Sequence, residues 1–311
     1  MRLRLITFGP ARPRLLAVVA PLVLCAGTAI GTAPVQSAHA SSPTCERPGE
    51  ALVCIIASTD LSIGRDRFTF GLLAVNHPLE VPRVSVEFFS FHGTGATATQ
   101  RLQARFNYFA RGLKDTDANR AAIEIGGVFV AYPTFKHAGT WGILITAPYH
   151  GHRYVLRDEF TVKTHGTTPD IGSAAPRSHN PTTAQEPASK LDSGRPPDDM
   201  HRLSIAAAIA QHRPLVVLFA TAAFCTSRLC GPEIGVVQGL ERKYRRRVNF
   251  IHIEIFKDAQ YSHGFAPTVK QWGLVTEPWV FVIDRRGFIT AKFEGPTPVG
   301  ELDPAIQKVL H

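Results

Sequence analysis

Cys225 and Cys230, separated by four residues in the segment CTSRLC, are the side chains of this sequence best suited to chemistry. They follow LVVLFA at 215–220, an apolar run typical of a buried strand. Open α/β sheets place their reactive groups where the chain leaves such a strand and enters a helix. The position of the two thiols therefore predicts either a redox-active pair or a disulfide at this junction.

The spacing of the pair sets a condition on the local backbone. In a regular helix, residues five apart have Cα atoms roughly 8–9 Å apart, whereas a disulfide needs less than about 7 Å. The bond can close only if 225–230 is not a continuous helix. Gly231, Pro232 and Glu233 are typical of a helix start. Because a helix N-terminus lowers thiol pKa, this local argument favours Cys230 as the more reactive thiol.

Alternating strands and helices surround the pair and must position it. Helices are expected at 201–212, 232–244 and 301–310, and a short helix or loop at 265–274. Buried strands are expected at 215–220, 248–256, 279–284 and 288–295, the last two joined by a DRRG turn. This order predicts a compact α/β domain over 201–311.

That order, the dithiol after the first strand and the segment WGLVTEPWVFVIDRRGFITAKFEG together resemble the thioredoxin superfamily. The resemblance implies thiol–disulfide exchange with protein partners, with no cofactor and no metal. It implies that Cys225 attacks and Cys230 resolves, and that Pro278 forms a cis bond facing the dithiol. It also implies a substrate groove, whose expected residues are Phe224, Thr276, Glu277, Pro278 and Trp279.

Several features differ from relatives with known chemistry, and alternatives stay open. Thioredoxins have Cys-x2-Cys, whereas this chain has Cys-x4-Cys. The spacing occurs in some peroxiredoxins, but Leu218 and Ala222 stand where their peroxide-positioning residues would be. The pair could also be a structural disulfide in a binding or scaffold module.

A copper chaperone of the Sco type is a further alternative. Those proteins resemble this chain in fold and use Cys-x3-Cys with a histidine after an aspartate, but here Arg285 follows Asp284. His252 and His263 could replace that histidine only with a different geometry. The metal-binding alternative is therefore weaker than thiol exchange.

Residues 1–40 have the pattern of a secretory signal peptide. Four arginines precede or flank the apolar segment LLAVVAPLVLCAGTAIG, and Ala38-His39-Ala40 fits a cleavage site. Cleavage near Ala40 would make the protein extracytoplasmic, and membrane association is expected only if the signal stays uncleaved. The formal charge is +9, and without these arginines 30 basic residues face 25 acidic ones. With one basic cluster, at 241–247, nucleic-acid binding is not expected.

The remaining cysteines fit an oxidising compartment. Apart from Cys25, the chain contains Cys45, Cys54, Cys225 and Cys230. Pairing of neighbours predicts a structural disulfide between Cys45 and Cys54 that holds the mature N-terminus, although other pairings fit the spacing.

Residues 41–163 predict an all-β domain, because short β-rich runs alternate with turn residues from about 58 onward. The segment FKHAGTWGILITAP resembles immunoglobulin-like accessory domains of bacterial exported proteins, which implies a two-sheet sandwich. Trp141 is expected in the core, and His150 and His152 in a solvated turn. Residues 164–200, rich in Pro, Ser, Thr and Gly, predict a linker. The expected architecture is a β-sandwich, a linker and a thioredoxin-like α/β domain.

Overall fold

The computed structural model describes residues 45–47, 50–74, 77–92, 95–109, 126–225, 227 and 229–311. Within 41–311 the chain forms one compact unit. The expected signal peptide lies outside the described residues and stays a prediction. None of the helices in the described ranges has the length and apolar character needed to cross a membrane.

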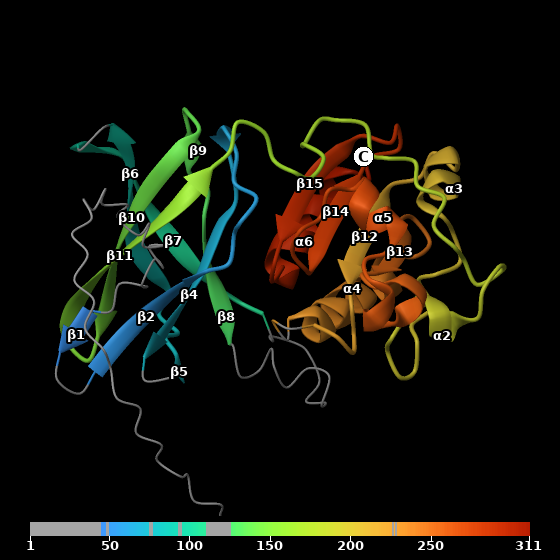
Figure 1. The fold of residues 1–311 in the computed structure, drawn as a ribbon, viewed down its shortest axis with the longest axis horizontal. Coiled ribbons are helices and arrows are strands. Elements are labelled where there is room, and N and C mark those ends of the chain that lie inside the picture. The colour runs from blue at the N-terminus through green and yellow to red at the C-terminus, as the bar shows by residue number, and fades with distance from the viewer. Residues whose placement is uncertain are drawn as a thin grey trace, which may run out of the picture. The chain divides into compact units, whose positions relative to one another are not determined.

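The N-terminal part is an antiparallel nine-stranded sheet (Figure 1). Eight strands follow the order β1-β2-β4-β8-β7-β6-β10-β11, β5 pairs with β4, and β3 pairs with β9 outside this sheet. The strands are β1 (Cys45–Arg47), β2 (Glu50–Ile56), β3 (Gly64–Arg65), β4 (Phe68–Ala74), β5 (His77–Pro78), β6 (Arg83–His92), β7 (Gly95–Tyr108), β8 (Gly127–Ala131), β9 (Thr134–Phe135), β10 (Gly139–Tyr149) and β11 (His152–Val162).

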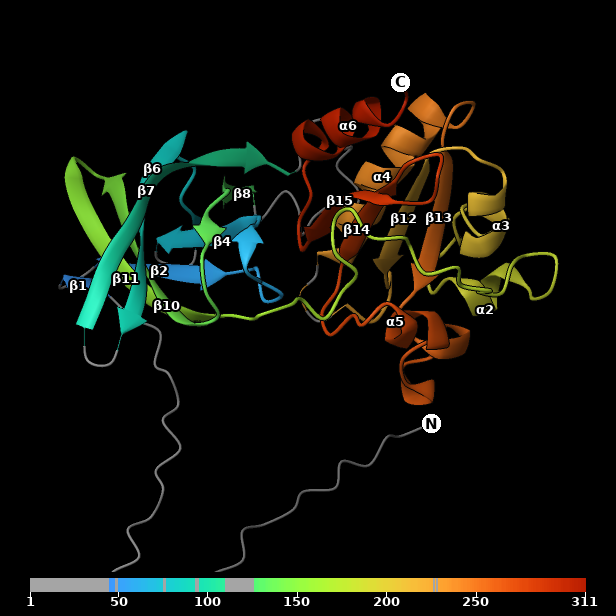
Figure 2. The same ribbon diagram turned by 90° about the horizontal axis from the view of Figure 1, so that it is seen from above.

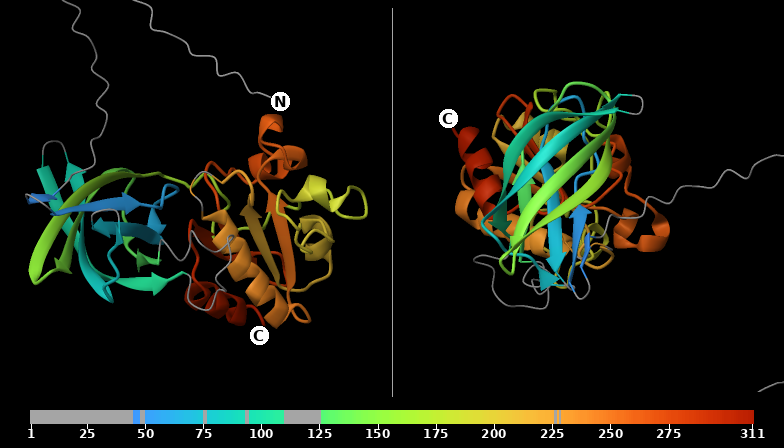
Figure 3. Two further views of the ribbon diagram at one scale, coloured as in Figure 1. Left: turned by 90° about the horizontal axis from the view of Figure 1, so that it is seen from below. Right: turned by 90° about the vertical axis from the view of Figure 1, so that its left-hand side faces the viewer.

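The expected β-rich runs are all strands, but the two-sheet immunoglobulin-like sandwich is wrong. One sheet is continuous because β6, β7, β10 and β11 pair along most of their length. The sheet curls until β11 approaches β1 and β2, as the right-hand view of Figure 3 shows. Its inner face encloses one core. Trp141 lies there as expected, 0% exposed, and donates its indole N–H to the His137 carbonyl.

His150 and His152 lie at the turn between β10 and β11, as expected. Both are exposed, and the His150 ring stacks on Tyr149 with centroids 4.0 Å apart. His150 and the adjacent Gly151 both have positive φ angles, 48° and 76°, as residues in a tight turn often do. Neither histidine belongs to a group of metal-ligating side chains among the described residues.

The C-terminal part is a four-stranded sheet in the order β13-β12-β14-β15 (Figure 2). β12 pairs parallel with β13 and antiparallel with β14, which forms a hairpin with β15. The elements are α3 (Ile205–Ala210), β12 (Leu215–Ala220), α4 (Cys230–Tyr244), β13 (Asn249–Glu254), η1 (Lys257–Ala259), η2 (Tyr261–His263), α5 (Pro267–Gln271), β14 (Trp279–Ile283), β15 (Ile289–Glu294) and α6 (Val299–Lys308). This is the order that the resemblance predicts.

The side chains of β12 pack on both faces of this sheet. All six residues of the strand are buried, because successive side chains point to opposite faces and both faces are packed. Val216 and Leu218 belong to one core with α4 and α6. Val217 and Phe219 belong to the other, with α3 and α5. A strand without polar positions is therefore the centre of the domain that carries the dithiol.

Residues 164–200 are not a free linker, in contrast to the expectation. The segment contains α2 (Ala188–Leu191), and Ser178 donates to Gln271 and accepts from the buried Trp272 indole. The Thr167 carbonyl oxygen approaches Gly273, where an added Cβ would overlap with it. Composition predicted a linker because few large apolar residues are present. The segment is held instead by polar contacts, which composition does not reveal.

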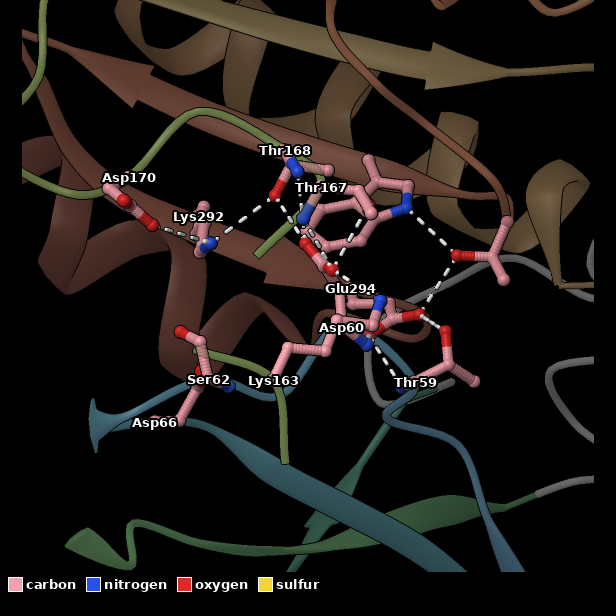
Figure 4. Close-up of polar contacts among 12 residues, drawn as sticks. Thr59, Asp60, Ser62, Asp66, Lys163, Thr167, Thr168, Asp170, Lys292 and Glu294 are labelled. Atoms are coloured by element: carbon pink, nitrogen blue, oxygen red, sulfur yellow. Dashed lines mark hydrogen bonds and ion pairs between the residues drawn. The ribbon is translucent and has the colours of Figure 1, made fainter. Parts of the chain in front are cut away.

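Asp60, which follows β2, anchors the start of this segment (Figure 4). Its carboxylate accepts a hydrogen bond from Lys163. It also accepts hydrogen bonds from the backbone N–H groups and the hydroxyls of both Thr167 and Thr168. Burial alone would favour the neutral acid, but these donors lower the pKa of Asp60 to about 2. The residues around 60 and 167 therefore form one polar junction.

A second carboxylate, Glu294 at the end of β15, contacts the same region (Figure 4). It accepts from the backbone N–H groups of Thr59 and Asp60 at 2.8 and 3.0 Å and from the Thr59 hydroxyl. It also accepts from the Thr276 hydroxyl at 2.8 Å. The β-rich part thus connects directly to the loop before β14.

Candidate redox site

The dithiol lies where β12 ends and α4 begins. The helix starts at Cys230, two residues before the expected Pro232, with Pro232 and Glu233 in its first turn. Cys225, Ser227 and Leu229, the described residues before it, are not helical. The condition for closing a Cys-x4-Cys bond is therefore met over these residues.

The Cys225 sulfur is surrounded by donors. It is half-buried, accepts a hydrogen bond from the backbone N–H of Cys230 at 3.2 Å, and lies 3.2 Å from the Ser227 hydroxyl. The main stabilisation of the Cys225 thiolate comes from the Cys230 thiol, and the Ser227 hydroxyl and backbone N–H groups add to it. Together they outweigh the effect of burial, which favours the neutral thiol. They lower the pKa of Cys225 to about 6.

Cys230 is the opposite kind of thiol. It is 0% exposed, and burial raises its pKa, with a further contribution from the neighbouring Cys225 sulfur. The local expectation that the helix N-terminus would activate Cys230 is therefore wrong. The first helical N–H group belongs to Cys230, but it points at the Cys225 sulfur and stabilises a charge there.

Glu277 and Pro278 lie beside the dithiol. The two sulfur atoms and a Glu277 carboxylate oxygen all lie within 4.8 Å of one another. The Glu277–Pro278 peptide bond is cis, as the resemblance implies. Glu277 is half-buried and Pro278 is buried. The chain segment before β14 thus faces the loop between β12 and α4.

Two residues expected in the substrate groove have structural contacts instead. Trp279 is 2% exposed, stacks on Phe281 and donates its indole N–H to the Thr276 hydroxyl at 3.0 Å. The Thr276 hydroxyl in turn donates to Glu294. Trp279 offers no surface to a substrate, because the first residue of a strand with both faces covered points into a core.

Phe224, also expected in the substrate groove, remains partly accessible. It is half-buried and makes an edge contact with Phe256 and a tilted one with Tyr261. Tyr261 is 63% exposed and Phe265 44% exposed. Phe224, Tyr261 and Phe265 pack around the buried Phe256 and form an apolar surface that includes the residue before Cys225, here called the aromatic surface.

Cys54 is a buried free thiol on β2, and burial raises its pKa. The backbone of Cys45 pairs with Leu52, so Cys45 and Cys54 lie diagonally across two strands, while the Cys45 side chain is outside the described part. The Cys45–Cys54 disulfide stays a prediction.

The histidines considered as copper ligands lie elsewhere. His263 pairs with Asp258 at 3.1 Å on the surface, and His252 contacts Asp198 at 2.8 Å. Among the described residues, the side chains that could hold a metal at the dithiol are Cys225, Cys230 and Glu277. None of the described histidines belongs to the group at the dithiol.

Sequence reasoning missed two features around the site. Ser227 could have been noticed as a hydroxyl within the CTSRLC segment. The second is a group of Asp192, Asp198, His201 and His252, three of which precede β12. The spacing of Asp192, Asp198 and His201 was a signal, but Asp192 and Asp198 sit at the end of the segment that composition assigned to a linker, and His201 directly follows it.

Comparisons with known proteins give little beyond this geometry. No protein-family model matches the chain, and no curated protein matches it. One similar solved structure is a thiol:disulfide interchange protein, a thioredoxin family protein from Chlorobium tepidum TLS. It is 17% identical, covers 46% of this chain and 97% of that chain, and has a TM-score of 0.31. At that score the similarity does not by itself establish a shared fold.

Proposed function

We propose that this protein is an extracytoplasmic thiol–disulfide oxidoreductase that acts on protein disulfides through Cys225 and Cys230. The observation that supports this most is the inequality of the two thiols. Cys225 is accessible and has its pKa lowered to about 6, whereas burial raises the pKa of Cys230. An attacking thiol should be ionised and accessible, and a resolving thiol should stay protonated until it is needed.

The exchange proceeds in two steps. The Cys225 thiolate attacks one sulfur of a substrate disulfide, a mixed disulfide forms, and the other substrate sulfur leaves as a thiolate that takes a proton. Cys230 then loses its proton and attacks the Cys225 sulfur, which releases the second substrate thiol. The substrate gains two electrons and the protein becomes a Cys225–Cys230 disulfide. In the reverse direction the protein oxidises its partner.

The second step needs a group that accepts the proton of Cys230. Glu277 is suited to this, because its carboxylate lies within 4.8 Å of both sulfurs, a distance that one water can bridge. Its charge also contributes to the raised pKa of Cys230. Glu277 would therefore keep Cys230 protonated at rest and receive its proton during resolution.

The partner is a polypeptide with apolar residues near its disulfide. In the aromatic surface, Phe224, Tyr261 and Phe265 pack around the buried Phe256, and Phe224 is the residue directly before Cys225. A Glu277 carboxylate oxygen lies within 4.8 Å of both sulfur atoms, and Pro278 follows Glu277 in the chain. Exposed aromatic side chains grouped in this way favour contact with another protein.

Trapping of the mixed disulfide tests this proposal. The Cys230→Ser variant should accumulate a covalent complex with a disulfide-containing protein, because nothing resolves the intermediate. Cys225→Ser should form none, and Cys54→Ala serves as the control for a cysteine outside the site. Non-reducing electrophoresis and mass spectrometry read the result. Equal trapping by Cys225→Ser and Cys230→Ser would contradict the assignment.

A non-catalytic module with a structural disulfide is the first rival. It predicts a reduction potential below about −300 mV for Cys225–Cys230, as structural disulfides have. A higher potential, measured by equilibration with a glutathione buffer, supports turnover. A value in the structural range would remove the oxidoreductase proposal.

A copper-binding role is the second rival, favoured by the compact group of Cys225, Cys230 and Glu277. Titration of the reduced protein with Cu(I) separates the two. Stoichiometric uptake that Cys225→Ser abolishes would favour the metal role, whereas its absence leaves thiol exchange.

The signal peptide and the β-rich part complete the proposal. N-terminal sequencing of the exported protein should place cleavage near Ala40, and an intact N-terminus would contradict it. The β-rich part would hold the loop before β14 through the Thr59–Glu294–Thr276 contacts. A variant without residues 41–163 should lose exchange activity, and unchanged activity on every partner would refute that role.

A further inference from the structure

Four side chains with metal-ligating atoms meet behind the dithiol loop. Asp192 follows α2, Asp198 and His201 lie in the chain between α2 and α3, and His252 lies on β13. One ligand atom of each lies within 4.8 Å of all the others. The side chains are 0–3% exposed. The group is therefore closed to solvent.

His201 supplies the observation that points to a missing partner. Its side chain is 3% exposed, and Nε2 makes no hydrogen bond, although buried polar atoms normally make one. The same atom lies 3.0 Å from Oδ1 of Asp198 and 3.6 Å from Oδ2 of Asp192. A buried nitrogen aimed at two carboxylates without hydrogen-bond geometry is suited to sharing a cation with them.

The contacts of His252 fix the direction of its other nitrogen. Nε2 lies 3.2 Å from the Ala220 carbonyl oxygen, which can only accept, so Nε2 carries the proton. In a neutral ring Nδ1 then presents a lone pair to Oδ2 of Asp198, 2.8 Å away. Two acceptors at that distance need a cation or a proton between them. Metal-ligating histidines usually donate their second N–H to such a carbonyl.

Backbone donors orient the two carboxylates. Gly194 and Asp198 donate their N–H groups to Oδ1 and Oδ2 of Asp192 at 2.7 and 2.6 Å. Met200 donates to Oδ1 of Asp198 at 2.9 Å. The ligands are therefore held in place by the chain itself, which lowers the entropy cost of binding an ion.

We propose that Asp192, Asp198, His201 and His252 form a closed structural site for a divalent transition metal, with Zn²⁺ the best-suited ion. Two imidazole nitrogens and two carboxylate oxygens match the ligands and coordination number of zinc. The two carboxylate charges balance the ion. In a tetrahedral site with metal–ligand distances of about 2.0–2.2 Å, the ligand atoms lie about 3.3–3.6 Å apart. The widest spacing that the 4.8 Å limit of this group allows would therefore contract by about 1 Å when the ion binds.

The site would connect the segment before α3 to the dithiol loop. Ser193, next to Asp192, accepts a hydrogen bond from the backbone N–H of Ala223 at 3.0 Å. His252 reaches the carbonyl of Ala220, the last residue of β12. A bound ion would hold both ends of this arrangement without touching the sulfurs.

Metal titration of a dithiol-free protein tests the proposal. With Cys225→Ser and Cys230→Ser in place, the protein should bind one equivalent of Zn²⁺ by calorimetry. With Co²⁺ it should show visible d–d absorption of a tetrahedral site without thiolate charge-transfer bands. His201→Ala on this background should weaken binding by more than about 100-fold, since even outer-shell losses cost 10–100-fold. His263→Ala, at an exposed Asp–His pair, should change nothing.

Two outcomes would overturn the proposal. Absence of stoichiometric Zn²⁺ and Co²⁺ uptake would show that protons alone hold the cluster together. Uptake with thiolate bands, or unchanged by His201→Ala, would place the metal elsewhere. The cobalt spectrum of the dithiol-free parent decides the ligand type even if His201→Ala fails to fold.

Discussion

The dithiol and the Asp192/Asp198/His201/His252 cluster are two groups of reactive side chains built around the same pair of strands. Each brings ligand atoms within 4.8 Å of one another. The dithiol has one half-buried thiol and one fully buried thiol, with opposite pKa shifts. In the cluster, all four side chains are closed to solvent to the same degree.

This difference in burial is what we expect between a group that exchanges disulfides and a group that stabilises the fold. A group that exchanges bonds with another protein must expose one reactive atom and keep its partner in reserve. A group that holds the chain together must exclude water and satisfy every charge internally. Burial and the inequality of partners, more than the residue types, distinguish the two sites.

The largest expected effect concerns the closed cluster. Asp198→Asn leaves two buried histidines without their shared carboxylate and should destabilise the fold by about 3–5 kcal/mol. Urea unfolding measures the change. Asp199→Asn is the matched control, because Asp199 is exposed and pairs with Arg202 at the surface, where ion pairs are worth about 0–1 kcal/mol. Equal effects of the two variants would break the comparison.

Among the described residues, Glu233 is a buried carboxyl group without a nearby histidine like those of the cluster, and its protonation should make stability depend on pH. Glu233, in the first turn of α4, accepts from the Thr297 N–H, while its Oε1 has no hydrogen-bond partner. Burial raises the pKa of Glu233 to about 8, so the folded protein keeps a proton that the unfolded chain loses above its ordinary value near 4.5. Unfolding releases this proton, and stability therefore falls as the pH rises between these values.

Glu233→Gln should remove that slope. Between about pH 5 and 8 the native protein should lose on the order of 3 kcal/mol more stability than the variant. Thermal unfolding of both proteins across this range measures the difference. Parallel pH profiles would show that Glu233 is ionised in the folded state.

The open site predicts a reactivity profile that depends on its buried member. Alkylation of Cys225 should follow an ionisation near pH 6. In Cys230→Ala the midpoint should move upward, because the Cys230 thiol is the main donor to the Cys225 sulfur. Iodoacetamide labelling rates against pH, followed by mass spectrometry of Cys225, give both midpoints. An unchanged midpoint would show that Ser227 and the backbone N–H groups suffice.

The smallest expected effect concerns the contact between the β-rich part and the dithiol domain. Thr59→Val removes one hydroxyl donor to Glu294 and keeps the two backbone donors of Thr59 and Asp60. A cost of about 1.5 kcal/mol is expected, the lower end of the range for a hydrogen bond to a charged group, because this contact is exposed. Thr140→Val, at an exposed position of β10, is the control in urea unfolding. A loss of several kcal/mol would mean that the contact supports the whole unit.

Short-range patterns determined much of this protein. The apolar run at 215–220, the helix-start residues after Cys230 and the turn residues between β-rich runs each depend on neighbours in sequence, and their elements are present. The same patterns placed the two cysteines at the end of a strand. Local chemistry is sufficient there because strand period, capping and turn preference act over a few residues.

Only the tertiary structure decided the remaining features. Whether Cys225 or Cys230 is more acidic depends on burial and on where one N–H points, and neither follows from spacing. Trp279 turned inward because both faces of its sheet are covered. Asp192 and His252 are 60 residues apart and meet only when 164–200 packs against β13. Long-range polar contacts of this kind leave no periodic signal in the sequence, because each depends on one or two side chains.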